Sequence, residues 1–428
     1  MSNFKIVVTA IFAICIVAGV VIFALSKGPS ATVSANLVVW GTISPEMFNL
    51  AYKNSSLSGN KQIKINYVKK DEASFDTDFV ESLAEGSGPD MVILRDDAIY
   101  KNQNKLFAIP YKNYTERNFK DTFIEAGELF LRPDGIIAVP FIVDPLVMYW
   151  NRDLFSNNNI SSPPKYWDEV YPLIEKTTLR DSSANVLKST IALGEWRNIT
   201  NAKEIISMLL LQAGTPITSQ TSDGKVSSVL NSQFDYPIAP SQSAINFYTE
   251  FSNPTSPRYT WNRSLPTSQN FFLSSNLALY IGFASEIFGI QQKNSNLNFD
   301  VTYAPQIRNA PKKVVFGHMY ALSIVKQSKQ VAGAFIAINA LTESETLKSL
   351  GVMTNLPPVR RDLLSSVPAD AFRTVFYNSA LVSHFWIDPN PTESSNTFRD
   401  MIDGVNSGRS RLIEALGRAD NELTAQLK

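Results

Sequence analysis

The chain has 428 residues, of which 44% are hydrophobic and 18% charged, and its 39 basic and 39 acidic residues give zero net charge. That length exceeds one ordinary hydrophobic core, so we expect two lobes. The composition is that of a globular protein, and without a basic excess the chain carries no electrostatic footprint for nucleic-acid binding.

The cysteine and histidine content argues against several kinds of site. The single cysteine, Cys15, lies in an N-terminal apolar run, so the rest of the chain has no thiol for disulfides, zinc or nucleophilic catalysis. His318 and His384 are the only histidines, and neither has a second histidine at metal-ligand spacing. We therefore expect no metal site and no cofactor.

The N-terminus carries twenty residues without a charge, 6–25. At about 1.5 Å per residue this run matches the roughly 30 Å hydrocarbon core of a bilayer. A cleavable signal peptide usually has a shorter apolar region followed closely by a small-x-small site. We predict a tail at 1–5, an uncleaved transmembrane anchor at 6–25 and a tether at 26–35, while Lys5 and Lys27 balance and do not orient the anchor.

The first part of the body shows an alternation of strand and helix patterns. The expected elements are a strand at 37–40 ended by Gly41, a helix opening at Pro45, strands at 63–68 and 91–94, and a helix at 75–83. This βαβαβ order predicts a parallel sheet with right-handed crossovers. Its ligand crevice should lie beyond the carboxyl ends of the strands, near Trp40 and Asp97.

Later segments predict a return to the same lobe. Residues 136–140 and 146–150 are expected to form two strands flanking Asp144, and 163–169 should start a helix. A second block follows, with strands at 301–305 and 319–325 and a helix at 330–342. Because this block suits the first lobe, we expect several crossings between lobes, which would form a hinge.

Six motifs in this order resemble the extracellular solute-binding proteins of family 1, the sugar-binding subunits of ABC importers related to maltose-binding protein. The resemblance spans nearly all of residues 36–428. The motifs are 37–41 (LVVWG), 88–92 (GPDMV), 135–155 with its VMYWNRDLF run, 163–169 (PPKYWDE), 272–283 and 317–325.

The resemblance implies an α/β, two-lobed, periplasmic-binding-protein-like (type II) fold with hinge crossovers, which closes on its ligand. Lobe 1 is expected at 36–110 plus 303–343, and lobe 2 at 111–302 plus 344–428. The implied function is capture of a small solute, a sugar or oligosaccharide, for delivery to an ABC importer. The protein would be a monomeric binding protein rather than an enzyme, with permease and ATPase subunits as partners.

One departure from the family concerns attachment to the membrane. Many relatives carry a lipobox cysteine for acylation, whereas Cys15 follows Ile14 instead of a small residue and precedes ten more apolar residues. We therefore expect the single-pass helix, rather than a lipid, to hold the body on the extracytoplasmic side of the cell membrane.

A sugar presents apolar ring faces and a rim of hydroxyls, so its site needs aromatic platforms and fixed polar partners. Each candidate also has a structural interpretation: the tryptophans can belong to the core, Asp97 can cap a helix, Asp144 can be a turn residue, and Glu195 can be a solvated charge. The candidate ligand-binding residues are Trp40, Asp97, Asp144, Glu195, Trp196, Trp261, Phe283 and Trp386.

Two other functions stay open at this point. A secreted glycoside hydrolase would need two carboxylates about 5–10 Å apart, for which Asp97, Asp144 and Glu195 are candidates. No G-x-S-x-G elbow, P-loop or strand-following G-x-G-x-x-G occurs in the sequence, so ATP hydrolysis would belong to partner chains. A ligand-sensing or adhesion module of the same fold is the second alternative.

Overall fold

The computed structural model describes residues 33–366 and 368–427. The predicted tail at 1–5 and anchor at 6–25 lie outside the described residues, as does most of the tether at 26–35. Within the part of the chain that the structure describes, no helix combines the length and apolar character needed to cross a membrane.

The first lobe is built on the predicted βαβαβ unit, which the structure confirms. Strands β1 (Ala35–Gly41) and β2 (Ile63–Lys69) are parallel, and β3 (Met91–Arg95) pairs with the other edge of β1. Helices α2 (Pro45–Asn54) and α3 (Phe75–Ala84) connect them, and α4 (Asp96–Asn102) follows β3. Helix α2 begins where Ser44 accepts a hydrogen bond from the Met47 N–H, with proline in the first turn.

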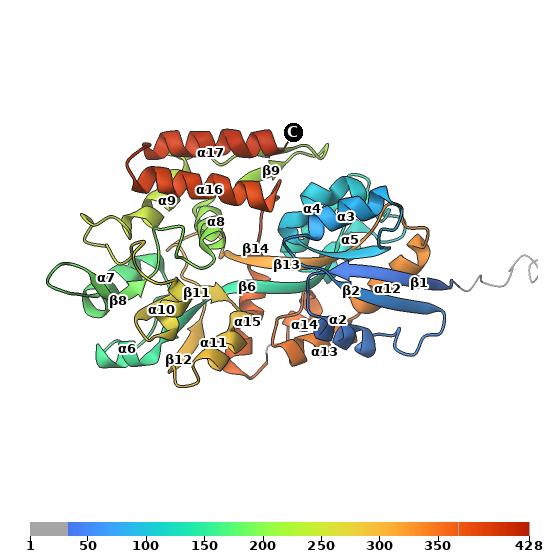
Figure 1. Ribbon diagram of the computed structural model, residues 1–428, viewed down its shortest axis with the longest axis horizontal. Coiled ribbons are helices and arrows are strands. Elements are labelled where there is room, and N and C mark those ends of the chain that lie inside the picture. The colour runs from blue at the N-terminus through green and yellow to red at the C-terminus, as the bar shows by residue number, and fades with distance from the viewer. Residues whose placement is uncertain (1–32, 367, 428) are drawn as a thin grey trace, which may run out of the picture.

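Two long antiparallel strands join the lobes through one continuous sheet. Strand β6 (Val139–Asn151) pairs with β13 (Val315–Ile324) along residues 139–145 and with β11 (Leu277–Phe283) along residues 146–150. The sheet order is β2-β1-β3-β13-β6-β11-β8-β7, so the first three strands belong to lobe 1 and the last three to lobe 2. Figure 1 shows β6 and β13 running horizontally through the middle of the molecule.

The continuity of β6 corrects the prediction of two strands separated at Asp144. Asp144 and Pro145 were interpreted as a break, but they lie opposite His318 and Gly317 in the antiparallel register with β13. Proline is tolerated in a strand at a position whose N–H would not take part in the hydrogen bonds between strands. The sequence alone does not show which positions these are. The residues expected in a turn therefore lie at the point where the chain passes between lobes.

Lobe 2 surrounds the other end of the sheet. Its C-terminal helices α16 (Pro391–Asn406) and α17 (Leu412–Gln426) pack side by side over α8 (Ala202–Ala213) and α9 (Pro240–Glu250), at the top of Figure 1. The remaining elements are β7 (Leu179–Arg180), β8 (Val186–Ile191), β9 (Thr218–Gln220), β10 (Val226–Ser228), β12 (Phe299–Thr302), α6 (Arg152–Asn157), α7 (Tyr171–Thr177), α10 (Ser268–Leu273) and α11 (Glu286–Lys293).

Residues after 343 do not all belong to lobe 2, which differs from the predicted boundary. Helix α13 (Ser344–Thr354) packs against α2, and the Thr346 hydroxyl donates a 3.4 Å hydrogen bond to the carbonyl of Asn54. Both helices bury their apolar faces, so α13 completes lobe 1 together with α12 (Val331–Leu341), α14 (Arg361–Leu364) and α5 (Glu116–Thr122). An amphipathic pattern predicts a buried face but not which lobe buries it.

The chain crosses once more near its end. Helix α15 (Ala371–Leu381) packs on β6 and β12, and β14 (Ser383–His384) then pairs with the start of β13. The short segments between lobe 1 and β6 are β4 (Leu131–Arg132) and β5 (Gly135–Ile136). Three segments therefore meet between the lobes, as expected of a hinge.

Candidate ligand-binding cleft

A cavity of about 740 Å³ lies between the two lobes. Lobe 1 supplies the loop after β1, the start of α3, the end of β3 and the first turns of α4, while lobe 2 supplies the first turns of α16. We call this space the interlobe cavity. Its lining residues are Thr42, Glu72, Ala73, Phe75, Asp76, Thr77, Ile93, Leu94, Arg95, Asp97, Ala98, Lys101, Pro391, Thr392, Ser395 and Asn396.

The charged groups of the lining are paired with one another. Arg95 donates to both carboxylate oxygens of Asp97, at 2.9 and 2.7 Å, and also contacts Glu72 at 3.0 Å. Burial raises the pKa of the Asp97 carboxyl, but the Arg95 guanidinium outweighs it and holds that pKa well below its usual range. Lys101 pairs in the same way with Asp76 at 2.7 Å. The lining therefore offers fixed charges and hydroxyl or amide groups, with Phe75 as its one aromatic ring.

Next to the cavity, His318 of β13 connects a carboxylate of each lobe. Its Nδ1 lies 2.9 Å from Asp96 of α4, and its Nε2 lies 3.5 Å from Glu204 of α8. Burial alone lowers the pKa of His318, but the charge of Asp96 and the hydrogen bonds to Asp96 and Glu204 raise it to about 10. The imidazolium form is therefore held between the lobes, with one N–H available to each carboxylate.

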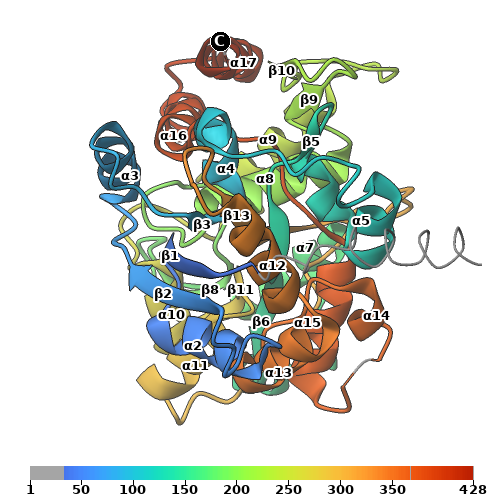
Figure 2. The same cartoon turned by 90° about the vertical axis from the view of Figure 1, so that its right-hand side faces the viewer.

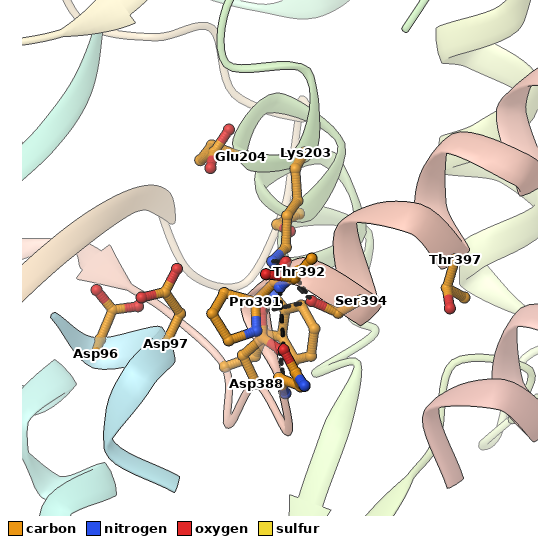
Figure 3. A network of polar contacts seen from close by, with 12 residues as sticks. Asp96, Asp97, Lys203, Glu204, Asp388, Pro391, Thr392, Ser394 and Thr397 are labelled. Atoms are coloured by element: carbon orange, nitrogen blue, oxygen red, sulfur yellow. Dashed lines mark hydrogen bonds and ion pairs between the residues drawn. The ribbon is translucent and has the colours of Figure 1, made fainter. Parts of the chain in front are cut away.

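A second buried ion pair lies beside this link, within lobe 2. Lys203 of α8 lies 2.5 Å from Asp388 and also donates to the Ser394 hydroxyl at 2.8 Å. Burial lowers the pKa of Lys203, but Asp388 and Asp97 outweigh it and raise that pKa. Figure 3 shows Asp97 at the start of α4 on one side and Lys203 with Asp388 on the other. These pairs fix the position of the first turn of α16, which lines the cavity.

Asp144 and Phe283 lie in the buried junction rather than in the cavity lining. Asp144 accepts a 3.0 Å hydrogen bond from the Ser285 N–H, and burial raises its pKa to about 6. The Phe283 ring stacks on His318 with 5.1 Å between ring centroids. Asp144 therefore lies within the crossing strand β6, and Phe283 lies at the end of β11, which pairs with β6.

Of the eight predicted ligand-binding residues, Asp97 lines the interlobe cavity. Trp40 is the second-last residue of β1, two residues before Thr42, and its half-buried ring lies 3.9 Å from the ammonium of Lys70. Trp40 thus lies close to the lining without forming part of it. The predicted crevice at the carboxyl ends of β1 and β3 does coincide with the cavity.

Glu195 and Trp196 lie elsewhere in lobe 2. Glu195 is buried and pairs with Arg263 at 3.3 Å, and the preceding Gly194 carbonyl accepts from Asn406 at the last turn of α16. The cavity is lined by the first turn of that helix, about 22 Å away along its axis. The structure therefore does not bring these residues together with Asp97.

Trp261 and Trp386 belong to the core, which argues against the predicted role as sugar platforms. Trp261 has no exposed surface, and its indole N–H donates to Asn198 at 3.1 Å. Trp386 is 4% exposed, stacks on Phe398 and donates to Ser207 at 3.1 Å. Polar residues flank both tryptophans in the sequence and indicated exposed loops, but both indole rings are buried.

The contributions of α8, α16 and His318 were not predicted from the sequence. His318 was considered only as a metal ligand, and no group of His, Cys, Asp and Glu in the described ranges could hold a metal ion. The start of α16 had a usable signal, because Asn390-Pro391 is a helix start, with Asn390 accepting from the Thr392 N–H at 3.2 Å. Because α16 begins almost 300 residues after Asp97, the sequence did not reveal that both line the same cavity.

Comparison with solved structures supports the fold. A cyclo/maltodextrin-binding protein complexed with maltotetraose superposes with a TM-score of 0.74 at 17% identity, covering 93% of this chain and 99% of that one. An ABC substrate-binding protein from Listeria monocytogenes in complex with cycloalternan gives a TM-score of 0.68 at 15% identity, covering 92% and 98%. At these identities the likeness establishes the two-lobed binding-protein fold.

Sequence relatives agree over a shorter stretch. A binding protein of Brucella abortus (strain 2308) is 32% identical over 92 residues, which is 21% of this chain and 22% of the relative. A binding protein of Brucella suis biovar 1 matches equally. The match thus spans about a fifth of the length of these curated relatives.

The model of the bacterial extracellular solute-binding protein family matches residues 51–373, about three quarters of the chain. The family and the structural neighbours are binding proteins rather than enzymes, and the family is extracellular, which places the body outside the cytoplasm. On this evidence, the chain belongs to the bacterial extracellular solute-binding proteins.

Proposed function

We propose that the protein captures a sugar or oligosaccharide in the interlobe cavity, closes around it and delivers it to an ABC importer. The observation that carries the proposal is that both lobes line one cavity. Since its volume of about 740 Å³ is within the range of small-molecule sites, it has room for a solute of this kind.

The chemistry of the lining favours a polar, hydroxyl-rich solute. Thr42, Thr392, Ser395 and Asn396 offer hydroxyl and amide groups, and Asp97 offers a carboxylate held ionised by Arg95. Phe75 can cover one apolar face of a ring. The two structural neighbours are in complex with maltotetraose and cycloalternan, which are oligosaccharides, and this supports the same ligand class.

The wider role is part of the same proposal. The body would be a monomer held to the membrane by the single-pass segment 6–25, and permease and ATPase subunits would receive the solute. Support comes from family membership and from the length of the apolar run. A sensing role for the same fold would differ in its partner rather than in its cavity.

A panel of sugars mixed with the purified protein tests the ligand class. A bound ligand stabilises the native state by mass action, by about 2.7 kcal/mol at a concentration one hundred times the dissociation constant. We expect at least one sugar to raise the melting temperature in a concentration-dependent way and to be recovered unchanged. If no mono- or oligosaccharide raises it, the proposed ligand class is wrong.

A further inference from the structure

A second cavity, of about 610 Å³, lies on the opposite side of the crossing strands from the interlobe cavity. In Figures 1 and 2, α3, α4 and α16 lie above β6 and β13, whereas α15 lies below them. We call this space the hinge cavity. Its lining residues are Pro164, Lys165, Tyr166, Thr302, Tyr303, Ala304, Gln306, Lys313, Val315, Asn378, Ser379, Leu381 and Val382, none of which lines the interlobe cavity.

Aromatic and aliphatic side chains make up about half of this lining, and two large ones, Tyr303 and Leu381, are exposed. Tyr303 is 45% and Leu381 is 41% exposed, although large apolar side chains usually find cover. The Tyr303 hydroxyl is fixed by a 3.0 Å hydrogen bond from Asn378, so the ring has a defined position. A preformed apolar surface with a few polar groups is the usual character of a small-molecule site.

The charged groups of the lining are all cationic. Lys165 and Lys313 are the charged residues of the lining, and no aspartate or glutamate lines the hinge cavity. Neighbouring cations have carboxylate partners, since Arg308 pairs with Asp168 at 2.9 Å and Lys312 with Glu125 at 3.7 Å. Lys165 and Lys313 have no such partner within residues 33–366 and 368–427. The cavity is therefore complementary to a negative charge next to an apolar body.

We propose that the hinge cavity binds a small amphipathic anion, with its apolar body against Tyr303 and Leu381 and its acidic group at Lys165 and Lys313. A planar aromatic carboxylate or sulfonate has this chemistry. Val315 and Val382, which are in the lining, are joined by a 3.0 Å backbone hydrogen bond where β13 and β14 meet. A ligand here would contact two of the three segments that cross between the lobes.

Isothermal titration of the full-length protein with naphthalene-2-sulfonate tests the proposal, with 2-naphthalenemethanol as the uncharged analogue. The wild type should bind the sulfonate saturably at one site and the alcohol more weakly. The double variant K165A/K313A should weaken sulfonate binding by about five- to tenfold, as expected for two exposed ion pairs. The variant L381D should abolish binding, because it places a carboxylate in the apolar lining.

The matched control is K112A/K348A, which removes two exposed lysines outside the hinge cavity and should leave sulfonate binding unchanged. Melting temperatures within a degree or two of the wild type establish that each variant is folded. Absence of saturable binding to the wild type would overturn the proposal. Binding that K165A/K313A and L381D leave unaltered would do the same, and neither result bears on sugar binding.

Discussion

His318 is the residue that most directly connects the two lobes. A neutral imidazole has one N–H, so it can donate to either Asp96 or Glu204 but not to both. The charged form satisfies both carboxylates, and its pKa of about 10 keeps it charged at neutral pH. Asp144, Arg95, Asp97 and Lys203 are the other charged groups facing this junction.

We expect H318Q to lower the free energy of unfolding by about 3 kcal/mol near neutral pH, because one buried carboxylate loses its partner. The folded-state pKa is raised from 6.5 to about 10, so the stabilisation is complete below pH 6.5 and disappears as the pH rises toward 10. Urea denaturation across this range should show the wild type and H318Q converging at high pH. H384Q, which alters a less buried histidine, is the control. A difference in unfolding free energy between the wild type and H318Q that stays constant across this pH range would contradict the charged state of His318.

For Asp144, in contrast to His318, we predict that the charged form of the side chain lowers the stability of the protein. Its pKa in the folded protein, about 6, exceeds the usual value of 3.8, so folding favours the protonated carboxyl. The protonated carboxyl therefore adds to the free energy of unfolding below pH 3.8, and this stabilisation is lost as the pH rises through 6. Above pH 6 the charged carboxylate lowers stability. D144N should therefore stabilise the protein by about 1–3 kcal/mol at pH 7.5 and by much less at pH 4. An equal change in the free energy of unfolding of D144N at both pH values would show that the charge of Asp144 is not the cause of the change.

At the scale of elements, the three crossing segments are closely packed at Gly317. A methyl group there would lie 2.7 Å from the Ser383 hydroxyl and 3.2 Å from the Pro145 backbone. We expect G317A to lower the unfolding free energy by about 1–3 kcal/mol, since β6, β13 and β14 would have to separate. G289A in α11 is the matched control, because nothing lies within 4 Å of its new methyl group. We expect G289A to stabilise α11 slightly. Equal changes in melting temperature for G317A and G289A would contradict the close packing of the strands at Gly317.

Helix α16 is the element through which lobe 2 reaches the interlobe cavity. Replacing Ser395 and Asn396 by alanine should weaken sugar binding about tenfold, because two polar partners of the solute are removed. D400A, on an exposed position of the same helix, should leave affinity unchanged. Titration calorimetry with the sugar that raises the melting temperature provides the measurement, and unaltered affinity in S395A/N396A would place the solute elsewhere.

Local patterns predicted the early elements of lobe 1 well, because β1, β2 and β3 are short apolar runs bounded by turn residues. Asp97 could be predicted to line the cavity because it comes shortly after such a strand. The patterns could not show that α13 joins lobe 1, or that α16 reaches Asp97, since both depend on contacts between distant segments. The patterns also did not show that Trp261 and Trp386 are buried, because an indole flanked by polar residues in the sequence can still lie in the core.

At the scale of the whole molecule, one sheet passes through both lobes, so movement of one lobe must bend β6, β13 and β14 at their meeting point. The His318 link to Glu204 and the interlobe cavity lie across this joint. Opening would separate α4 from α16 and admit a solute, and closure would surround it.

Small-angle X-ray scattering of the purified protein, with and without a saturating sugar that raises its melting temperature, tests closure most directly. We expect a smaller radius of gyration in the sugar-bound protein, because both lobes line the cavity that would hold the solute. The same radius of gyration with and without bound sugar would contradict it.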